Sequence, residues 1–200
     1  NIDLSDAKTD KLDIDLSHEN DLQDYISQYL KVNNAKAAFG GYLEKRNLYD
    51  RSEHFMTTSL SQVRNIHLGL DVWASEETSI YSPLSGRIHS QKNNFNFGDY
   101  GPTLILEHNL DGFVFYTLYG HLSENSLYKF KTGDEIKKNQ PIANLGNSLV
   151  NGNYPPHLHF QIIIDLQTFH GDYPGVSSQD DLDFYKKNCP NPNLIFKLKS

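Results

Sequence analysis

The sequence has little of what several classes of protein require. Its 200 residues contain one cysteine, Cys189, which excludes an internal disulfide framework and a zinc site built on cysteines. Lys and Arg number 18 against 25 Asp and Glu, a formal net charge of −7, whereas a nucleic-acid binder needs a clustered basic face. No apolar run reaches the roughly 18 residues of a membrane-spanning helix. We therefore expect neither a nucleic-acid partner nor a membrane span.

Aromatic residues are plentiful, with 12 Tyr and 11 Phe. Such residues bury large areas and favour the pleated surface of a sheet. Beyond residue 60 the chain alternates short apolar runs with turn residues, and the runs 103–108 and 113–119 flank a turn at 109–112, as in a hairpin. Because no helical pattern separates these runs, the sequence predicts a mainly β, antiparallel domain.

The chain divides into three parts by composition. Residues 1–60 form an N-terminal extension, in which apolar spacing predicts one helix over 20–32, with Asn20 as its N-cap. The charged and aromatic run 42–49 is typical of a solvated edge, with a substrate contact by Glu44 or Arg46 as the alternative. Residues 61–166 form the core. Residues 167–200 form a C-terminal extension packed on the core, with a short helix expected over 180–187.

The stretch 157–164 is the one around which the others are organised. His157, His159 and Gln161 fall on one face of the expected strand, with the two histidine Cα atoms about 7 Å apart. The opposite face is apolar and consists of Leu158, Phe160, Ile162 and Ile164. One interpretation is a pair of surface histidines on a half-exposed strand. The other interpretation is a metal site in which the two imidazoles are ligands.

Two further stretches carry candidate ligands. His67 and Asp71 share one face of an alternating run, but a flat strand would separate their Cα atoms by about 13 Å, so the chain must bend, and Gly69 permits the bend. A helix with His and Asp at i and i+4 is the competing interpretation. His121 follows Gly120 where a strand ends. Together these residues supply the nitrogen and oxygen ligands that a mononuclear zinc site needs.

Five blocks of the sequence extend this pattern beyond the ligands themselves. They lie at 67–72, 80–88, 119–122, 132–136 and 156–161, and they contain H-x-x-x-D, then a lone His, then H-x-H. In this order and spacing they resemble the lysostaphin/LytM-type zinc metalloendopeptidase family, whose fold is the duplicated hybrid motif. The resemblance covers about residues 64–165.

The resemblance implies a role for each matching residue. His67, Asp71 and His159 would bind one Zn²⁺, and His121 and His157 would be catalytic, one accepting a proton and the other stabilising the transition state. The family hydrolyses peptide bonds in stem peptides or cross-bridges of bacterial peptidoglycan. The implied substrate is therefore peptidoglycan or another peptide. The implied location is extracytoplasmic, in the periplasm or cell envelope, with the cytoplasm as an alternative for a part of a larger protein.

Two alternatives compete with this enzyme, and a third concerns its regulation. A non-catalytic module of the same fold would bind peptidoglycan or an amidase partner, although all five motif positions are intact here. A cupin-like metal oxygenase also places H-x-H on a strand, but it would want a glutamate soon after the pair, and Gln161 follows instead. The third alternative is regulatory, because the 60-residue extension could occlude the cleft.

The other polar residues carry weaker signals. Tyr154 precedes the histidine strand and is a candidate substrate-binding residue at the cleft rim, although packing is the simpler role. The polar and aromatic loop 93–101 is a candidate cleft wall. Five histidines have no partner at ligand spacing and are expected to be structural or on the surface: His18, His54, His89, His108 and His170.

Overall fold

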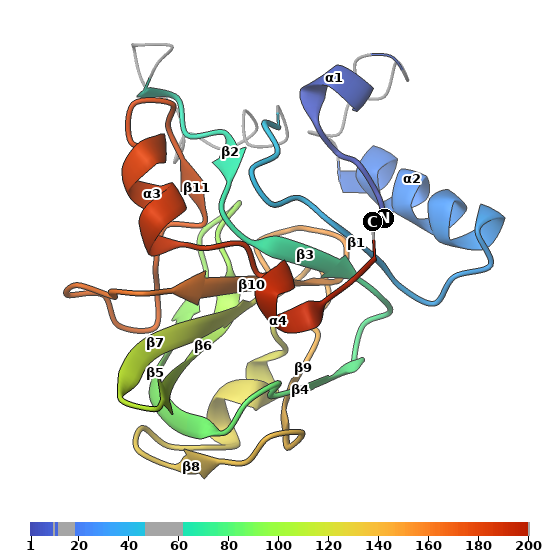
Figure 1. The fold of residues 1–200 in the computed structure, drawn as a ribbon. Helices are drawn as coiled ribbons and strands as arrows, with labels where there is room; N and C mark the ends of the chain where they lie inside the picture. Colours follow the sequence, from blue (N-terminus) through green and yellow to red (C-terminus); the bar gives the residue numbers. More distant parts are fainter. Residues whose placement is uncertain (10, 12–18, 47–61, 200) are drawn as a thin grey trace.

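One large antiparallel sheet forms the centre of the molecule. A computed structural model describes residues 1–9, 11, 19–46 and 62–199. The sheet has seven strands in the order β1-β3-β10-β7-β6-β5-β8, and each neighbouring pair is antiparallel (Figure 1). In that order the strands are Ala38–Gly40, Leu70–Trp73, His157–Ile163, Phe113–Gly120, Gly101–Leu110, Gly86–Asn94 and Glu135–Ile136. The expected mainly β, antiparallel fold is confirmed.

Smaller elements surround this sheet. Two further antiparallel pairs join β2 (Ile66–His67) to β11 (Val176–Ser177) and β4 (Ser79–Tyr81) to β9 (Pro141–Asn144). The helices are α1 (Asp6–Thr9), α2 (Glu19–Val32), η5 (Glu124–Tyr128), α3 (Leu182–Asn188) and α4 (Asn193–Phe196). In Figure 1, α2 lies towards the β1 edge of the sheet and α3 lies beside β11. Among the described helices, none has both the length and the apolar character needed to cross a bilayer.

Local sequence signals placed several of these elements well. The expected hairpin is β6 and β7, and its turn residues Asp111 and Gly112 have φ values of 52° and 90°, as a two-residue turn with the twist of a hairpin requires. The expected helix over 20–32 is α2, which begins one residue earlier, so Asn20 lies inside it and is not its cap. The short C-terminal helix is α3, which begins two residues later than expected.

Strand β10 is buried on both faces. All seven of its residues are buried, so the interpretation of His157 and His159 as surface residues on a half-exposed strand is wrong. Leu158, Phe160 and Ile162 pack into the main apolar core, as the alternation predicted. The histidine face is covered as well, and its imidazoles therefore need partners inside the protein.

The described part of the N-terminal extension is attached to the edge of this sheet. β1 pairs with β3 in a register that places Gly40 opposite Asp71. Ile2 and Leu22 belong to an apolar cluster that also contains Trp73 and Tyr154. The extension thus packs against the strand that carries Asp71.

Candidate metal centre and active site

In the sheet, β10, which carries His157 and His159, lies between β3 and β7, and both neighbours bring polar side chains close to it. β10 pairs with β3 on one side, where His159 lies opposite Asp71, and with β7 on the other, where His159 lies opposite Gly120. His121 follows Gly120 directly. Residues far apart in the chain therefore converge on His159.

His67 lies next to His159 and Asp71 because the chain bends between His67 and Asp71, as the length of a flat strand required. β2 ends at His67, a bend follows at Gly69, and β3 begins at Leu70, so the predicted bend is confirmed and the helical alternative is wrong. The bend also presses Gly69 against the site. A Cβ atom on Gly69 would lie 2.5 Å from Cε1 of His159, closer than real Cβ atoms approach.

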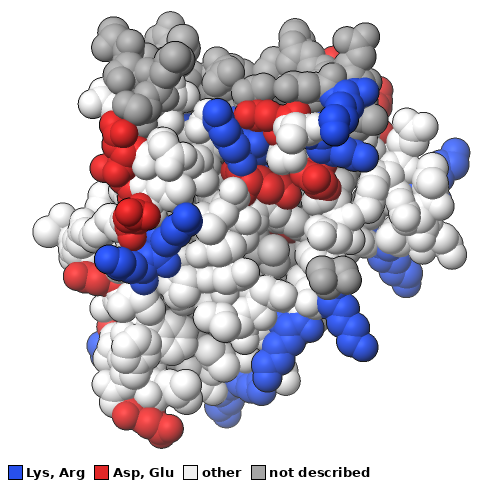
Figure 2. Space-filling view, turned by 45° about the horizontal axis from the view of Figure 1, so that its top comes forward, with Lys and Arg blue, Asp and Glu red and all other residues white. Residues whose placement is uncertain are grey.

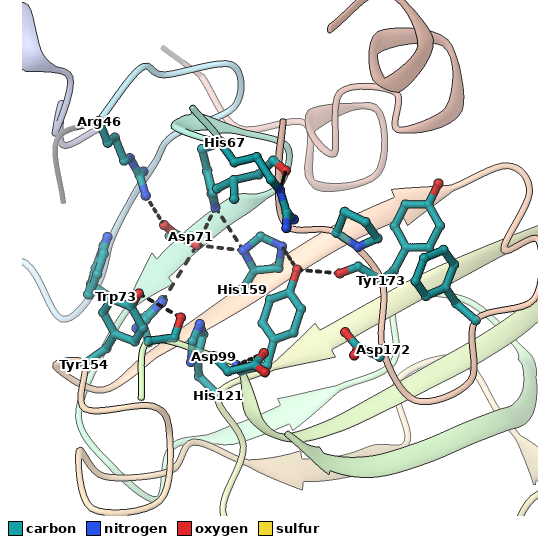
Figure 3. A pocket seen from close by; sticks show the side chains of 18 residues that line it. Arg46, His67, Asp71, Trp73, Asp99, His121, Tyr154, His159, Asp172 and Tyr173 are labelled. Atoms are coloured by element: carbon teal, nitrogen blue, oxygen red, sulfur yellow. Dashed lines mark hydrogen bonds and ion pairs between the residues drawn. The ribbon is translucent and has the colours of Figure 1, made fainter. Parts of the chain in front are cut away.

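The three expected metal ligands meet in one buried group. His67 Nε2 lies 2.9 Å from His159 Nδ1 and 3.3 Å from Asp71 Oδ1, and His159 Nδ1 lies 3.4 Å from the same oxygen. Within the described residues, His67, Asp71 and His159 are the group whose ligand atoms, all within 4.8 Å of one another, could hold a metal ion. Figure 3 shows these side chains pointing toward one another.

Hydrogen bonds on the outer side of each ring fix which nitrogen faces the group. A backbone carbonyl only accepts, so His67 Nδ1 donates to Gly41 O at 2.9 Å and leaves Nε2 with its lone pair. The Gln161 amide nitrogen donates to Pro174 O and to Cys189 Sγ, and its Oε1 therefore accepts from His159 Nε2 at 2.9 Å. His159 consequently faces the group with the lone pair of Nδ1.

This donor set fits a cation. Two imidazole lone pairs face each other at 2.9 Å, and without a positive charge between them they repel. Asp71 Oδ1 is buried and has no hydrogen-bond partner among the described residues. A buried anionic oxygen of this kind is costly unless a charge or a metal compensates it. Two imidazoles and one carboxylate are ligands typical of catalytic zinc, which keeps a fourth position open.

Burial favours the neutral form of His67 and of the neighbouring His157, and neutral imidazole is the form that binds a metal. Desolvation lowers the pKa of His67 to about 4, and desolvation likewise lowers the pKa of His157 to about 4. Burial alone would raise the pKa of Asp71, but the adjacent positive charge of Arg46 holds it well below its usual range. At neutral pH His67 and His157 are therefore neutral and Asp71 is charged.

His121 and His157 lie beside the ligand group. Their rings are 4.1 Å apart, and His157 Nε2 lies 4.0 Å from Asp71 Oδ1. His157 Nδ1 donates to Pro155 O at 2.8 Å and His121 Nδ1 donates to Asn151 O at 2.7 Å, so the two Nε2 atoms keep their lone pairs. Burial lowers the pKa of His121 well below its usual range, and the neighbouring His157 lowers it further.

His121 also has an unusual backbone. Its φ of 62° lies in the left-handed region, which is uncommon for a residue with a side chain. Hydrogen bonds on both sides hold it there, from its own N–H to Tyr100 O at 2.8 Å and from Gly146 N–H to its O at 2.9 Å. Strained residues held this firmly are concentrated at functional sites.

A cavity of about 330 Å³ opens over these side chains. Gly98, Asp99 and Tyr100 line it, so the loop 93–101 supplies a wall, as expected. The sequence did not single out Tyr100 itself, whose hydroxyl donates to Tyr173 O at 3.1 Å and lies 3.4 Å from His159 Nε2. Figure 3 shows Tyr173 and Asp172 on the far side of this cavity from Arg46 and Asp71.

Tyr154 lines the cavity as well, but its hydroxyl is directed at the protein. The oxygen donates to Gly98 O at 3.1 Å, and the ring packs with Trp73 in the apolar cluster next to α2. Tyr154 as a whole is 4% exposed. These contacts favour the packing role, and a substrate contact by Tyr154 stays a prediction.

The prediction that residues 42–49 form a solvated edge is wrong for Arg46. Its side chain is 2% exposed, and its Nη1 lies 2.7 Å from Asp71 Oδ2. Its Nε and Nη2 each lie 3.0 Å from Glu44 Oε2. No local pattern marks such an arginine, because its burial depends on a carboxylate 25 residues further along the chain.

The histidines without ligand spacing lie away from the group. His108 is buried, with Nδ1 2.9 Å from Ser85 O and Nε2 2.7 Å from Thr117 Oγ1, so its structural role is confirmed. The rings of His89 and His170 stack at 5.2 Å nearer the surface. His18 and His54 lie outside the described residues, as does the stretch 47–61 of the extension on which the occlusion hypothesis depends.

Charged side chains of both signs occur together on the face shown in Figure 2, and the described residues form no continuous basic patch there. The expectation that the chain does not bind nucleic acid stays a prediction.

Comparisons with solved structures give several partial likenesses. The catalytic domain of lysostaphin from Staphylococcus simulans is 27% identical, over 80% of this chain and 96% of that chain, with a TM-score of 0.45. A zinc-containing peptidase from Vibrio cholerae is 28% identical over 50% of this chain and 28% of that chain, with a TM-score of 0.39. The solution structure of lysostaphin is 25% identical, and this chain spans 52% of its length, with a TM-score of 0.47.

No curated protein matches the chain. The model of one protein family does, over residues 65–170, which is more than half of the sequence and includes every motif histidine together with Asp71. This chain belongs to peptidase family M23.

Proposed function

We propose that this chain is a zinc-dependent endopeptidase that hydrolyses peptide bonds in stem peptides or cross-bridges of bacterial peptidoglycan. The observation that carries the proposal is the convergence of His67, Asp71 and His159 beneath a cavity, with two further histidines at its side. Membership of a peptidase family supports the reaction class and speaks against the cupin-like alternative. An enzyme that hydrolyses peptidoglycan would act outside the cytoplasm.

His67, Asp71 and His159 would hold the ion, each through the atom that its outer hydrogen bond leaves available. A zinc ion held there supplies Lewis-acid polarisation of a scissile carbonyl and makes a water molecule acidic enough to react near neutral pH. The three protein ligands leave a position for that chemistry. The cavity above them admits a peptide segment.

His157 and His121 are the proton carriers in this proposal. Both are neutral at pH 7 because burial lowers their pKa values, and each has a lone pair on Nε2. One of them accepts the proton of the attacking water on Nε2 and, now charged, donates that proton to the leaving amine, while the other is the candidate for stabilising the transition state. Stacking on Trp73 at 4.1 Å and the bond to Pro155 O hold the His157 ring for this task.

The test is mass spectrometry of purified peptidoglycan after incubation with the full chain, with and without a zinc chelator. We expect new peptide fragments that disappear with the chelator, and their masses identify the bond. His157→Gln is the matched variant, because it removes a proton carrier and none of the three ligands. A protein that binds zinc yet leaves peptidoglycan of several cross-bridge types intact would refute the enzyme and favour the binding module.

A further inference from the structure

The segment 41–46 lies directly behind two of the three candidate ligands, although it precedes the span that the family model matches. The N–H of Leu43 donates to His67 O at 2.8 Å, and the N–H of His67 donates to Glu44 O at 2.9 Å. Gly41 O accepts from the His67 ring at 2.9 Å. Backbone and side chain of His67 are therefore both positioned by this segment.

Arg46 makes the corresponding contact to the carboxylate. Its Nη1 lies 2.7 Å from Asp71 Oδ2, the length of a charge-assisted bond, and both side chains are 2% exposed. On the other edge of the guanidinium, Nε donates to Glu44 Oε2 at 3.0 Å, and Nη2 lies 3.0 Å from the same oxygen as part of the ion pair. Anchored on Glu44, the planar group cannot follow Asp71 if that carboxylate rotates.

The two oxygens of Asp71 are consequently divided between two tasks. Oδ2 faces Arg46, whereas Oδ1 faces His67 Nε2 at 3.3 Å and His159 Nδ1 at 3.4 Å. A cation bound among the histidines meets Oδ1 directly. It could gain Oδ2 only if the ion pair with Arg46 were broken.

We propose that Arg46 is a positioning residue that holds Asp71 as a one-oxygen ligand, and that residues 41–46 are an integral part of the metal centre. The proposal rests on the zinc site of the proposed function. A carboxylate that ligated through both oxygens would fill the position that a catalytic metal keeps for water and substrate. Arg46 therefore preserves an open coordination position.

Cobalt(II) substitution of the full chain tests this directly, because four-coordinate cobalt absorbs visible light several-fold more strongly than five-coordinate cobalt. We expect strong bands in the wild-type protein and a several-fold weaker spectrum in Arg46→Met, since Asp71 is then able to supply its second oxygen. Arg87→Met is the matched control. It removes an arginine–carboxylate pair with Glu107, at 2.6 Å and with Arg87 55% exposed, and should leave the spectrum unchanged.

Stability gives a second measurement that a purely structural role would not reproduce. In the zinc-free protein, Arg46→Met leaves the buried Asp71 charge without its partner and should lower the melting temperature by about 10 °C. In the metal-loaded protein the loss should be smaller, because the ion supplies the missing counter-charge. A residue that only packs would lower both temperatures equally, and that result would overturn the proposal.

Arg46→Lys covers the case in which Arg46→Met does not fold. The lysine keeps the charge, so the zinc-free protein should melt near the wild-type temperature, but one ammonium group cannot hold Glu44 and Asp71 in the same fork geometry. Its cobalt spectrum should weaken in the same direction. Wild-type spectra in the folded Arg46 variants would overturn this proposal alone, whereas a wild-type protein that takes up neither zinc nor cobalt would overturn the proposed function with it.

Discussion

Gly69→Ala is the substitution that tests the geometry of the site most directly. The added Cβ would lie 2.5 Å from His159 Cε1, 2.6 Å from His159 Nε2 and 2.9 Å from Phe160 O. Carbon atoms in a packed interior sit about 3.5–4.0 Å apart, so the ring has to move by roughly 1 Å. The backbone at Gly69 does not have a positive φ, so alanine itself is not strained there.

The ring has little room for such a shift. Its Nε2 is bound to Gln161 Oε1 at 2.9 Å, and Phe160 O belongs to the central strand β10. Overpacking of this kind costs about 1–3 kcal/mol of folding free energy. Displacement of a ligand or catalytic group by about 1 Å costs on the order of 100-fold in activity. We therefore expect a folded variant with weakened zinc binding and about 1% of wild-type turnover.

Zinc affinity, measured by competition with a chromophoric chelator, and peptidoglycan turnover are the two assays. Gly112→Ala is the control, because a Cβ there meets nothing within 4 Å, while its φ of 90° still imposes backbone strain. That variant should lose stability and keep its zinc. If Gly69→Ala bound zinc and turned over substrate like the wild type, the close approach of Gly69 to His159 would be refuted.

Other substitutions and conditions test the separate roles. His159→Ala should abolish both zinc binding and turnover, whereas His157→Ala should keep most of the zinc and lose turnover. Equal zinc loss in the two variants, measured by elemental analysis, would contradict the division between ligand and proton carrier. Burial lowers the folded-state pKa of His67 and His157 to about 4, so below about pH 6.5 the unfolded chain binds more protons than the folded one. The zinc-free protein should therefore lose stability as the pH falls from about 6.5 to about 4, and the loss should be shallower in His157→Gln. Urea titrations across this range measure the free energy of unfolding. A free energy that did not change with pH would mean that the rings are already charged in the folded protein. Tyr154→Phe removes the bond to Gly98 O and should cost about 0.5–1.5 kcal/mol in thermal unfolding with turnover nearly unchanged, and a large loss of turnover at unchanged stability would favour a substrate contact.

The parts of the site that the sequence predicted are those that follow from local alternation and reach. Period-two alternation placed His157 and His159 on one face of a strand, and that strand is β10. The distance between His67 and Asp71 on a flat strand required a bend, and the chain bends at Gly69. Both inferences use only the geometry of a single strand, and for that reason no knowledge of the surrounding fold was needed.

The residues that the sequence did not reveal depend on contacts made across the fold. Tyr100 lies in the polar and aromatic loop 93–101, but nothing in that composition distinguishes it from its neighbours. Its hydroxyl acquires a role only because Tyr173, 73 positions later, presents a carbonyl to it. β1 has three residues, too few for a periodic pattern, and it exists because the edge of β3 offers unpaired backbone groups. Alternation within a segment carries no information about either partner.

Arg46 shows why the limits of a family match and the limits of a functional site can differ. The match begins at residue 65, yet the partner of Asp71 Oδ2 and the acceptor of the His67 ring both lie in residues 41–46. The motif alone identifies His67, Asp71 and His159, but it does not specify the hydrogen bonds that these side chains make on the side away from the metal site. Those outer bonds select the ring nitrogen and the carboxylate oxygen that remain for a metal. The motif therefore indicates which residues would bind a metal ion, while the segment before it determines which atoms of two of them remain available for one.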